Sequence, residues 1–250
     1  MIYENLVDIH SHILPGVDDG AASISESIDM LKLAIGQGIG TIYATPHYGK
    51  LNKEYDVDTI KKVFELLQKA IKQYNIDINI ELGHEIYYTS DVVDDLNAGR
   101  ALCLGNTKNV LIEFSTGTDF ATIIAATREL MRADYLPIIA HAERYVALHN
   151  IDNVEKIRKE GARIQVNADM LTEPPAKEER NTFFSKRQKN DRISSFREAA
   201  WKLLQADVVD FIATDAHNSS YRKPIMRDAL QMIEKVLGID NKNCQYCNYC

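Results

Sequence analysis

Short apolar runs, rich in β-branched residues, alternate with amphipathic stretches along most of the chain. Seven runs have the length and composition of buried strands: residues 6–9, 41–45, 78–82, 110–114, 136–140, 163–167 and 209–213. Six stretches carry apolar residues at helical spacing: one opening at the capping box Ser23–Glu26, then residues 57–74, 121–133, 154–160, 196–205 and 224–237. Strands that alternate with helices pair in parallel through right-handed crossovers. The pattern therefore predicts an α/β fold.

The number of strand–helix units indicates how the sheet closes. About seven units in a chain of 250 residues suit one closed or distorted barrel better than two small domains. No repeat of 20–50 residues is evident, which argues against a solenoid. We predict a distorted parallel β/α barrel of about seven strands, related to the TIM barrel, as a single domain over residues 1–240.

Two segments depart from this alternation. Residues 174–195 are crowded with charges, and we predict a charged surface insertion there, either over the top face of the barrel or simply solvated. Residues 241–250 hold Cys244, Cys247 and Cys250. Three thiols at this spacing could bind a metal, but no fourth ligand is nearby, so we predict an unstructured tail.

Composition narrows the class of protein. The chain is 45% hydrophobic and 26% charged, which is ordinary for a soluble globular protein. Its net charge of −7 argues against a general nucleic-acid-binding surface, which needs a basic field. The N-terminus lacks the basic and apolar segments of a signal peptide, and no apolar run reaches the ~18 residues of a membrane span. We expect a cytoplasmic protein with no nucleic-acid partner and no membrane insertion, and the oligomeric state stays open.

Histidines and acids follow the ends of the predicted strands again and again. They are His10, His12, His47, Glu85, Glu113, His141, Asp215 and His217. In parallel β/α folds the carboxyl ends of the strands face one shared site. Side chains two apart on an extended strand point the same way, so both imidazoles of His10-Ser11-His12 can meet one cation. A single histidine at a strand end is more often structural, but the whole set predicts a metal centre.

The ligand types indicate which ions the centre takes. Imidazole and carboxylate without thiolate suit manganese, iron or zinc, and disfavour a structural cysteine-rich zinc site. The candidates are too many for one ion, so we predict two or three; Asp18 and Asp19 could add a further carboxylate. Such clusters generate hydroxide at neutral pH and hold the oxygens of a phosphoryl group.

Two arginines favour a phosphate substrate. Arg144 lies three residues after His141, and Arg222 lies five after His217, both on loops at the predicted site. Guanidinium groups bind phosphate through two parallel hydrogen bonds and stay charged. A peptidase or deaminase has less need of two such groups. Each arginine taken alone is equally well explained as a surface residue.

Several motifs along the chain resemble those of the polymerase and histidinol phosphatase (PHP) superfamily. More closely, they resemble the bacterial CpsB/CapC-type manganese-dependent protein tyrosine phosphatases of capsule and exopolysaccharide synthesis. The motifs are DIHSHILPGVDDG at 8–20, ATPH at 44–47, GHEI at 83–86, LIEF at 111–114, IAHAERY at 139–145, QVNA at 165–168 and FIATDAHN at 211–218. They run in order through nearly the whole chain.

The resemblance implies a trinuclear metal site and a role for each residue. His10 and His12 would bind one ion with Glu85 and Asp215. Glu85 would bridge to a second ion held by Glu113 and His141. Asp19, His47 and His217 would hold the third. Arg144 and Arg222 occupy the places of the family's phosphate-binding and catalytic arginines. The resemblance implies Mn²⁺ as the metal; iron or zinc remain alternatives.

The implied activity is hydrolysis of protein phosphotyrosine by a metal-activated hydroxide, on a tyrosine autokinase of capsule synthesis. If the leaving phenolate needs a proton, His47 or His217 is the nearest donor. Cys103 lacks the signature of cysteine-based tyrosine phosphatases. The alternatives are a PHP phosphatase for histidinol phosphate or a sugar phosphate, a PHP phosphodiesterase or exonuclease, and a binding module that metals merely stabilise.

Overall fold

The computed structural model describes residues 3–49, 55–174 and 191–238. All seven predicted strands are present, and every strand pair is parallel. They are β1 (Leu6–Ser11), β2 (Ile39–Ala44), β4 (Asn79–Leu82), β6 (Asn109–Glu113), β7 (Leu136–Ile139), β8 (Arg163–Asn167) and β9 (Phe211–Ala213). The predicted α/β fold with a curled parallel sheet is confirmed.

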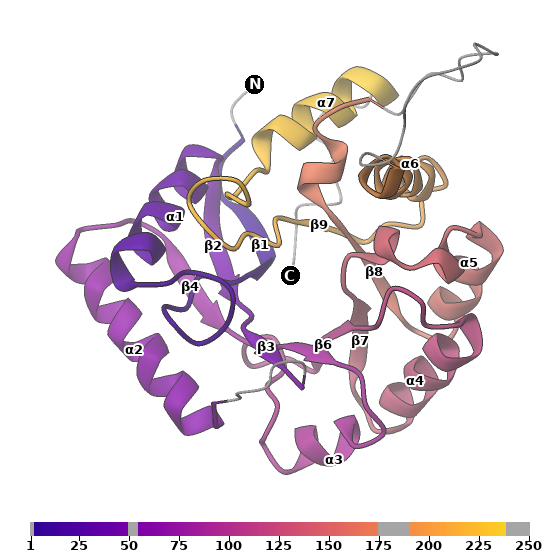
Figure 1. Ribbon diagram of the computed structural model, residues 1–250, viewed down its shortest axis with the longest axis horizontal. Helices are drawn as coiled ribbons and strands as arrows, with labels where there is room; N and C mark the ends of the chain where they lie inside the picture. Colours follow the sequence, from indigo (N-terminus) through magenta and orange to yellow (C-terminus); the bar gives the residue numbers. More distant parts are fainter. Residues whose placement is uncertain (1–2, 50–54, 175–190, 239–250) are drawn as a thin grey trace.

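Two short strands, which the pattern does not predict, help the sheet to curl. After a break of two residues, β3 (His47–Tyr48) continues the line of β2, and β5 (Glu85–Tyr87) continues that of β4. Hydrogen bonding then orders the sheets as β1-β2-β4 and β3-β5-β6-β7-β8-β9. The ring closes where the segment after β9 returns to β1, since the amide of Asp215 donates to the carbonyl of His10 at 2.8 Å. The result is a distorted barrel (Figure 1).

Helices surround the strands on the outside, as Figure 1 shows. The larger ones are α1 (Ile24–Gly36), α2 (Val57–Gln73), α4 (Phe120–Arg132), α5 (Ile151–Lys159), α6 (Asp191–Gln205) and α7 (Arg227–Leu237). The predicted start of α1 is confirmed, because the side chain of Ser23 accepts a hydrogen bond from the amide of Glu26. The described residues contain no helix long and apolar enough to cross a membrane.

Some elements differ from the prediction. Helix α3 (Val92–Asn97) is not predicted from the sequence, because six residues are too few for a clear helical period and no side chain caps its start. Helix α6 begins at Asp191 instead of near residue 196, so it takes in the last part of the predicted insertion. Residues 175–190 of that insertion, and the predicted tail 241–250, lie outside the described residues.

Apolar side chains form two clusters that leave one end of the barrel for polar groups. A large cluster fills the space between strands and helices. A smaller one gathers apolar residues from several strands, among them Ile9 of β1, Leu111 of β6 and Ile138 of β7. The buried polar residues, in contrast, concentrate at and after the carboxyl ends of the strands. The hydrophobic core therefore supports a polar site at that end.

Candidate metal centre

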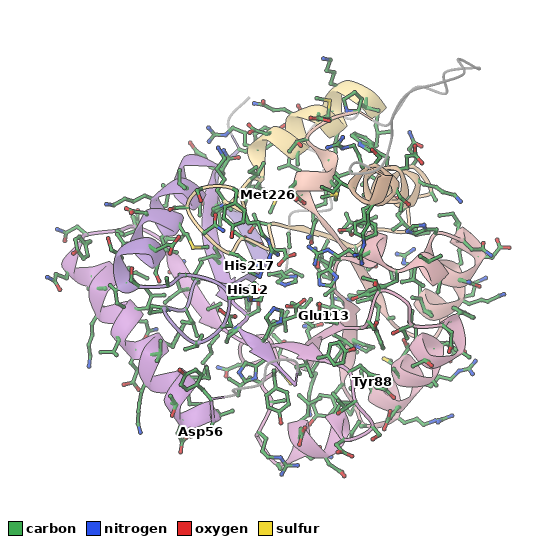
Figure 2. All side chains as sticks on the ribbon, viewed as in Figure 1. His12, Asp56, Tyr88, Glu113, His217 and Met226 are labelled. Carbon is green, nitrogen blue, oxygen red and sulfur yellow. The ribbon has the colours of Figure 1, made fainter. Side chains whose placement is uncertain are left out.

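The strand ends bring the predicted ligands together. Nine residues gather at the carboxyl end of the barrel: His10, His12, Asp19, His47, Glu85, Glu113, His141, Asp215 and His217. All are buried or nearly so except Asp19, whose side chain is 58% exposed. Figure 2 labels three of them, His12, Glu113 and His217, which lie in the middle of the ring of helices. These are the nine residues named from the sequence.

The first group lies at the end of β1. Nε2 of His10 and Nε2 of His12 are 3.3 Å apart, so the alternation along an extended strand does turn both rings the same way. Each of these nitrogens lies 3.4 Å from a Glu85 carboxylate oxygen. Each also lies 3.5 Å from Oδ1 of Asp215, which comes from the other end of the chain. Two imidazoles and two carboxylates thus converge on one point.

Glu85 links this first group to a second. Its Oε1 lies 2.7 Å from Nε2 of His141, and its Oε2 lies 2.8 Å from Nδ1 of His47. Glu113 approaches the same two imidazoles, at 3.6 Å and 3.8 Å respectively. A carboxylate whose two oxygens face different groups has the geometry of a bridging ligand. This arrangement supports the bridging role that the family resemblance implies for Glu85.

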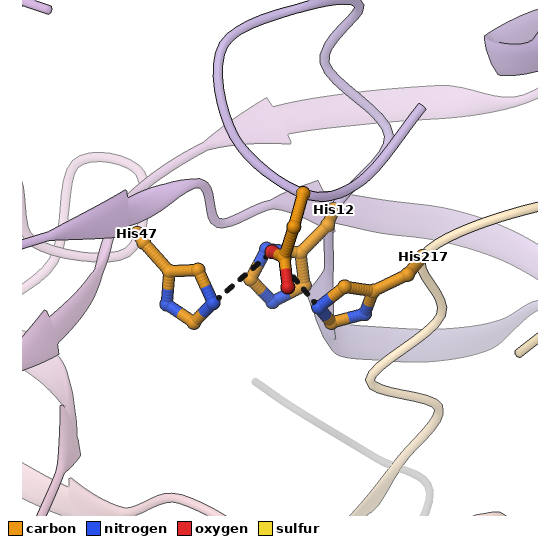
Figure 3. A group of neighbouring side chains, drawn as sticks. His12, His47 and His217 are labelled. Carbon is orange, nitrogen blue, oxygen red and sulfur yellow. Dashed lines mark ion pairs between the residues drawn. The ribbon is translucent and has the colours of Figure 1, made fainter. Parts of the chain in front are cut away.

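The third group gathers around Asp19. Oδ1 of Asp19 lies 3.4 Å from Nε2 of His47 and 3.4 Å from Nε2 of His217. Figure 3 shows these two rings on either side of His12, with the ion pairs dashed. The neighbouring His217 and His47 imidazoles hold the pKa of the Asp19 carboxyl far below its usual range. Asp19 is therefore ionised and able to act as a ligand.

One glutamine fixes the tautomer of His10. The backbone amide of His141 can only donate, and it lies 2.8 Å from Oε1 of Gln165, which identifies that atom as the oxygen. The same oxygen lies 3.1 Å from Nδ1 of His10, so Nδ1 must carry the proton and donate. The Gln165 amide nitrogen donates to Asn167, and Asn167 in turn donates to Oδ2 of Asp215 at 2.8 Å. The Nε2 lone pair of His10 is thus directed at the centre.

Two further imidazoles are fixed in the same way. Nδ1 of His12 donates to the Asp18 carboxylate at 2.7 Å, and Nδ1 of His217 donates to the Asp215 carbonyl at 2.9 Å. Oδ1 of Asp18 also accepts from the amide of Gly20 at 2.9 Å. A side chain at Gly20 would collide with the carbonyl of His12, which explains the glycine in this motif. Oxygen partners of this kind commonly orient histidines that bind metals.

These tautomers leave a gap that a cation fits. With both Nδ1 protons committed, the Nε2 atoms of His10 and His12 face each other at 3.3 Å, so one cation can lie between them. In the ion-free protein a proton serves, because burial lowers the pKa of His12 but the carboxylates of Asp18, Asp215 and Glu85 outweigh it and raise that pKa. Metal–ligand distances of about 2.0–2.2 Å place neighbouring ligand atoms roughly 3 Å apart, close to the spacings in all three groups. His47 Nδ1 and Glu85 Oε2 make no hydrogen bond despite being 2.8 Å apart. The donor set therefore suits divalent metal ions.

Two of the candidate ligands sit in a strained backbone conformation. His141 has φ of 32° and Asp215 has φ of 49°, in the left-handed region that non-glycine residues rarely adopt. Each lies just after the end of its strand, β7 or β9, where the chain must turn sharply to present the side chain inward. Such strain is typically kept at functional sites. Burial and the nearby Arg144 lower the pKa of His141 to about 4, which keeps the imidazole neutral.

Both predicted arginines lie at the edge of the centre. Nη2 of Arg144 donates to Oδ2 of Asp215 at 2.5 Å, and Nη2 of Arg222 lies 3.0 Å from the same oxygen. Their side chains are 27% and 35% exposed, so each guanidinium contacts the buried acid and still reaches solvent. Two cations on one carboxylate form a positively charged margin beside the site. This position suits contact with an anionic substrate.

Three polar residues of the site have roles that the sequence pattern does not assign. The pattern offers Asp18 only as a ligand, and Gln165 and Asn167 only as part of a motif. Their side chains hydrogen-bond candidate ligands, and the one signal for this in the sequence is the placement of two amides, Gln165 and Asn167, at the inward end of a strand. The histidines outside the ligand set make structural bonds: Nδ1 of His84 accepts from the Leu102 amide, and His149 bonds the Glu143 carbonyl.

Comparisons with known proteins agree with this geometry. A family model described as "Capsular polysaccharide synthesis, CpsB/CapC" matches residues 6–248. The chain is 31% identical to tyrosine-protein phosphatase CpsB of Streptococcus agalactiae, over 95% of this chain and 93% of that protein.

Solved structures give the same relationship. One, from a study of YwqE of Bacillus subtilis and CpsB of Streptococcus pneumoniae as metal-dependent tyrosine phosphatases, superposes with a TM-score of 0.81. It is 30% identical and covers 94% of this chain and 89% of its own. A TatD-family hydrolase of Entamoeba histolytica, 12% identical with a TM-score of 0.51 over 96% and 94% of the two chains, shares the fold alone.

Proposed function

This chain belongs to the CpsB/CapC family of capsular polysaccharide synthesis, and from that premise we propose that it is a metal-dependent protein tyrosine phosphatase. The observation that carries the proposal is the convergence of nine imidazole and carboxylate ligands beside two arginines. The relatives named as tyrosine phosphatases share this architecture over nearly the whole chain. The substrate class is thus a phosphate monoester of a protein tyrosine.

The three groups of ligands suggest how ions are held. His10, His12, Glu85 and Asp215 would hold one, Glu85 with Glu113 and His141 a second, and Asp19 with His47 and His217 a third. Mn²⁺ is the proposed metal, because the family resemblance implies it and a set of imidazoles and carboxylates without thiolate is compatible with it. When bound, such ions activate water and neutralise charge on a phosphoryl group.

Arg144 and Arg222 are the proposed phosphate-binding groups. A phosphoryl oxygen could take the place of Asp215 as partner of each guanidinium, since both arginines reach solvent. Planar guanidinium groups match the oxygens of a phosphate and stay charged at any working pH. Fixed positive charge at this point would stabilise negative charge that develops on the transferring group. The arginines would therefore both bind and orient the substrate.

The leaving group needs little help from the protein. A tyrosyl oxygen leaves as a phenolate with an ordinary pKa of about 10, far below that of an alkyl alcohol. His47 and His217, the proton donors named from the sequence, would be engaged as ligands of the third ion beside Asp19, so we assign neither of them a proton transfer to this oxygen. Cys103 has no place in the mechanism, because it is absent from all three groups of ligands and burial raises the pKa of its thiol.

The proposed physiological substrate is a tyrosine autokinase of capsule or exopolysaccharide synthesis. Support comes from the description of the family, which ties it to capsular polysaccharide synthesis. The experiment that tests the proposed substrate class compares kcat/KM for a phosphotyrosyl peptide, histidinol phosphate and a sugar phosphate. We expect the peptide to be the best substrate. A clear preference for either small molecule would reassign the chain to small-molecule phosphatases.

A further inference from the structure

The turn after β9 is held rigid by one side chain. Oδ1 of Asn218 accepts hydrogen bonds from the amide of Ser220, the hydroxyl of Ser220 and the amide of Arg222, each at 3.0 Å. The amide of His217 closes the turn by donating to the carbonyl of Arg222 at 2.9 Å. Asn218 itself is buried. Because three bonds meet on one buried oxygen, residues 218–222 have a fixed conformation.

This turn directs two neighbouring side chains to different environments. The guanidinium of Arg222 reaches inward to Asp215, at 3.0 Å from its carboxylate and 3.3 Å from its carbonyl. Tyr221 is 86% exposed, more than any other large hydrophobic residue that the structure describes. At this exposure the ring of Tyr221 is not part of the hydrophobic core. Exposed apolar groups of this kind commonly mark a binding surface.

Two aliphatic residues are exposed at the same end of the barrel. Val146 is 69% exposed and lies two residues after Arg144, in the short 3-10 helix η2 (Val146–Leu148) that follows β7. Ile193 is 54% exposed and lies in the first turn of α6, the helix that precedes β9. The side chain of the adjacent Arg192 bonds Thr116 in the loop after β6, which places this turn at the carboxyl ends of the strands.

The three exposed residues thus share an end of the barrel with the two arginines. Helix α6, which carries Ile193, packs against the 3-10 helix η1 (Ala142–Arg144), which carries Arg144, and η1 in turn contacts η2, which carries Val146. We refer to Val146, Ile193 and Tyr221 as the apolar rim. Both guanidinium groups reach solvent, so the ester group of a phosphate that they hold can extend outward past the elements that carry the rim.

We propose that the apolar rim, and Tyr221 above all, receives the aromatic ring of the phosphotyrosyl substrate while Arg222 holds its phosphate. This inference rests on the proposed function and adds a specificity determinant to it. The occupant is an aryl group because Tyr221 directly precedes a phosphate-binding arginine, and the ring is the part of phosphotyrosine joined to the phosphate. An aromatic pair excludes water from both rings and favours aryl over alkyl esters.

The test compares Tyr221→Ala and Tyr221→Phe with the parent, all loaded with Mn²⁺. Two constants are measured: KM for a phosphotyrosyl peptide, and Ki for inorganic phosphate, which carries the charge of the substrate without its ring. We expect Tyr221→Ala to raise KM roughly fivefold and to leave Ki unchanged. Tyr221→Phe should keep the parental KM, because it keeps the ring. Tyr74→Ala is the matched control, since Tyr74 is exposed on the distant C-terminus of α2.

Two outcomes would contradict the proposal. Equal increases in KM and Ki would assign Tyr221 to the shape of the turn alone, because the phosphate subsite would have changed too. An unchanged KM in Tyr221→Ala would show that the ring makes no contact with the substrate. A parent enzyme that does not hydrolyse the peptide at all would instead contradict the proposed function. The Ki of phosphate, measured with another monoester as the substrate, would distinguish this failure from a failure of the Tyr221 proposal.

Discussion

The side-chain oxygen of Gln165 lies 3.1 Å from Nδ1 of His10 and sets which nitrogen of that imidazole faces the metal centre. The oxygen is identified by the amide of His141, which donates to it at 2.8 Å. The tautomer of His10 thus follows from a backbone hydrogen bond made by another ligand. Through Asn167 the same chain of amides reaches Asp215. Strand β8 contributes none of the nine candidate ligands, yet it orients at least three of them.

Replacing Gln165 should therefore weaken metal binding more than it weakens the fold. In Gln165→Ala, Nδ1 of His10 and the amide of His141 both lose their acceptor. Loss of such a partner typically lowers metal affinity roughly 10- to 100-fold, and we expect a decrease of this size. Isothermal titration with Mn²⁺ measures it, with Gln68→Ala on the exposed face of α2 as control. Equal affinity in the two variants would show that Gln165 does not orient the ligands.

Metal loading should release protons near neutral pH. Burial alone would lower the pKa of His47, but the carboxylates of Glu85 and Asp19 outweigh it and raise that pKa to about 9 in the ion-free protein. The extra stability that His47 gives the ion-free fold is fully present below its unfolded value of 6.5 and is lost as the pH rises through about 9. A metal must displace this proton, so affinity should increase from pH 7 to 9.

Calorimetry in two buffers with different ionisation enthalpies measures the protons released on Mn²⁺ binding. We expect release at pH 7.5 and less release above pH 9, where His47 is already neutral. An affinity that is the same across this range would mean that no ligand is protonated in the ion-free site. In that case the carboxylates around His47 would not act on it as described.

The arginines should act on substrate and leave the metals in place. Replacing Arg222 by Lys keeps the charge but removes the planar fork that matches a phosphate. We expect kcat/KM for a phosphotyrosyl peptide to fall at least tenfold, with the bound metal content unchanged. Arg132→Lys, on the exposed end of α4, is the control. Full activity in Arg222→Lys would remove this arginine from the phosphate site.

Replacing Cys103 and replacing His141 should have opposite effects on phosphatase activity. Cys103→Ser should retain activity, because no cysteine takes part in the proposed chemistry. His141→Ala should lose most of it, since Nε2 of His141 lies 2.7 Å from Glu85 and within 3.6 Å of Glu113. Both are measured as initial rates on a phosphotyrosyl peptide, with folding checked by circular dichroism. An inactive Cys103→Ser would point to a cysteine nucleophile.

Much of the site can be predicted from the sequence because the order of strands and helices determines which residues lie together. Parallel strands bring their carboxyl ends together, so residues as far apart as His10 and Asp215 can be assigned to one centre from the order of strands and helices alone. Most of the seven strands are detectable because buried parallel strands are apolar runs, whereas β4 is partly exposed and alternates polar with apolar residues. Short elements such as α3 leave too weak a period to detect.

What the sequence does not reveal depends on side-chain pairs distant in the chain. Nothing in the pattern says that Gln165 meets His10, or that Asp18 orients His12 instead of binding a metal. The left-handed backbone at His141 is equally hidden, because histidine carries no conformational signal comparable to that of glycine. These features arise only when the barrel closes and sets strand ends against one another.

The measurement that tests the central claim most directly is phosphotyrosine hydrolysis before and after removal of metal. The purified protein is treated with a chelator, its metal content is determined, and activity on a phosphotyrosyl peptide is assayed with and without added Mn²⁺. We predict that activity falls to background on chelation while the fold persists, and returns as two to three ions bind per chain. Full activity in protein shown to contain no metal would contradict the account.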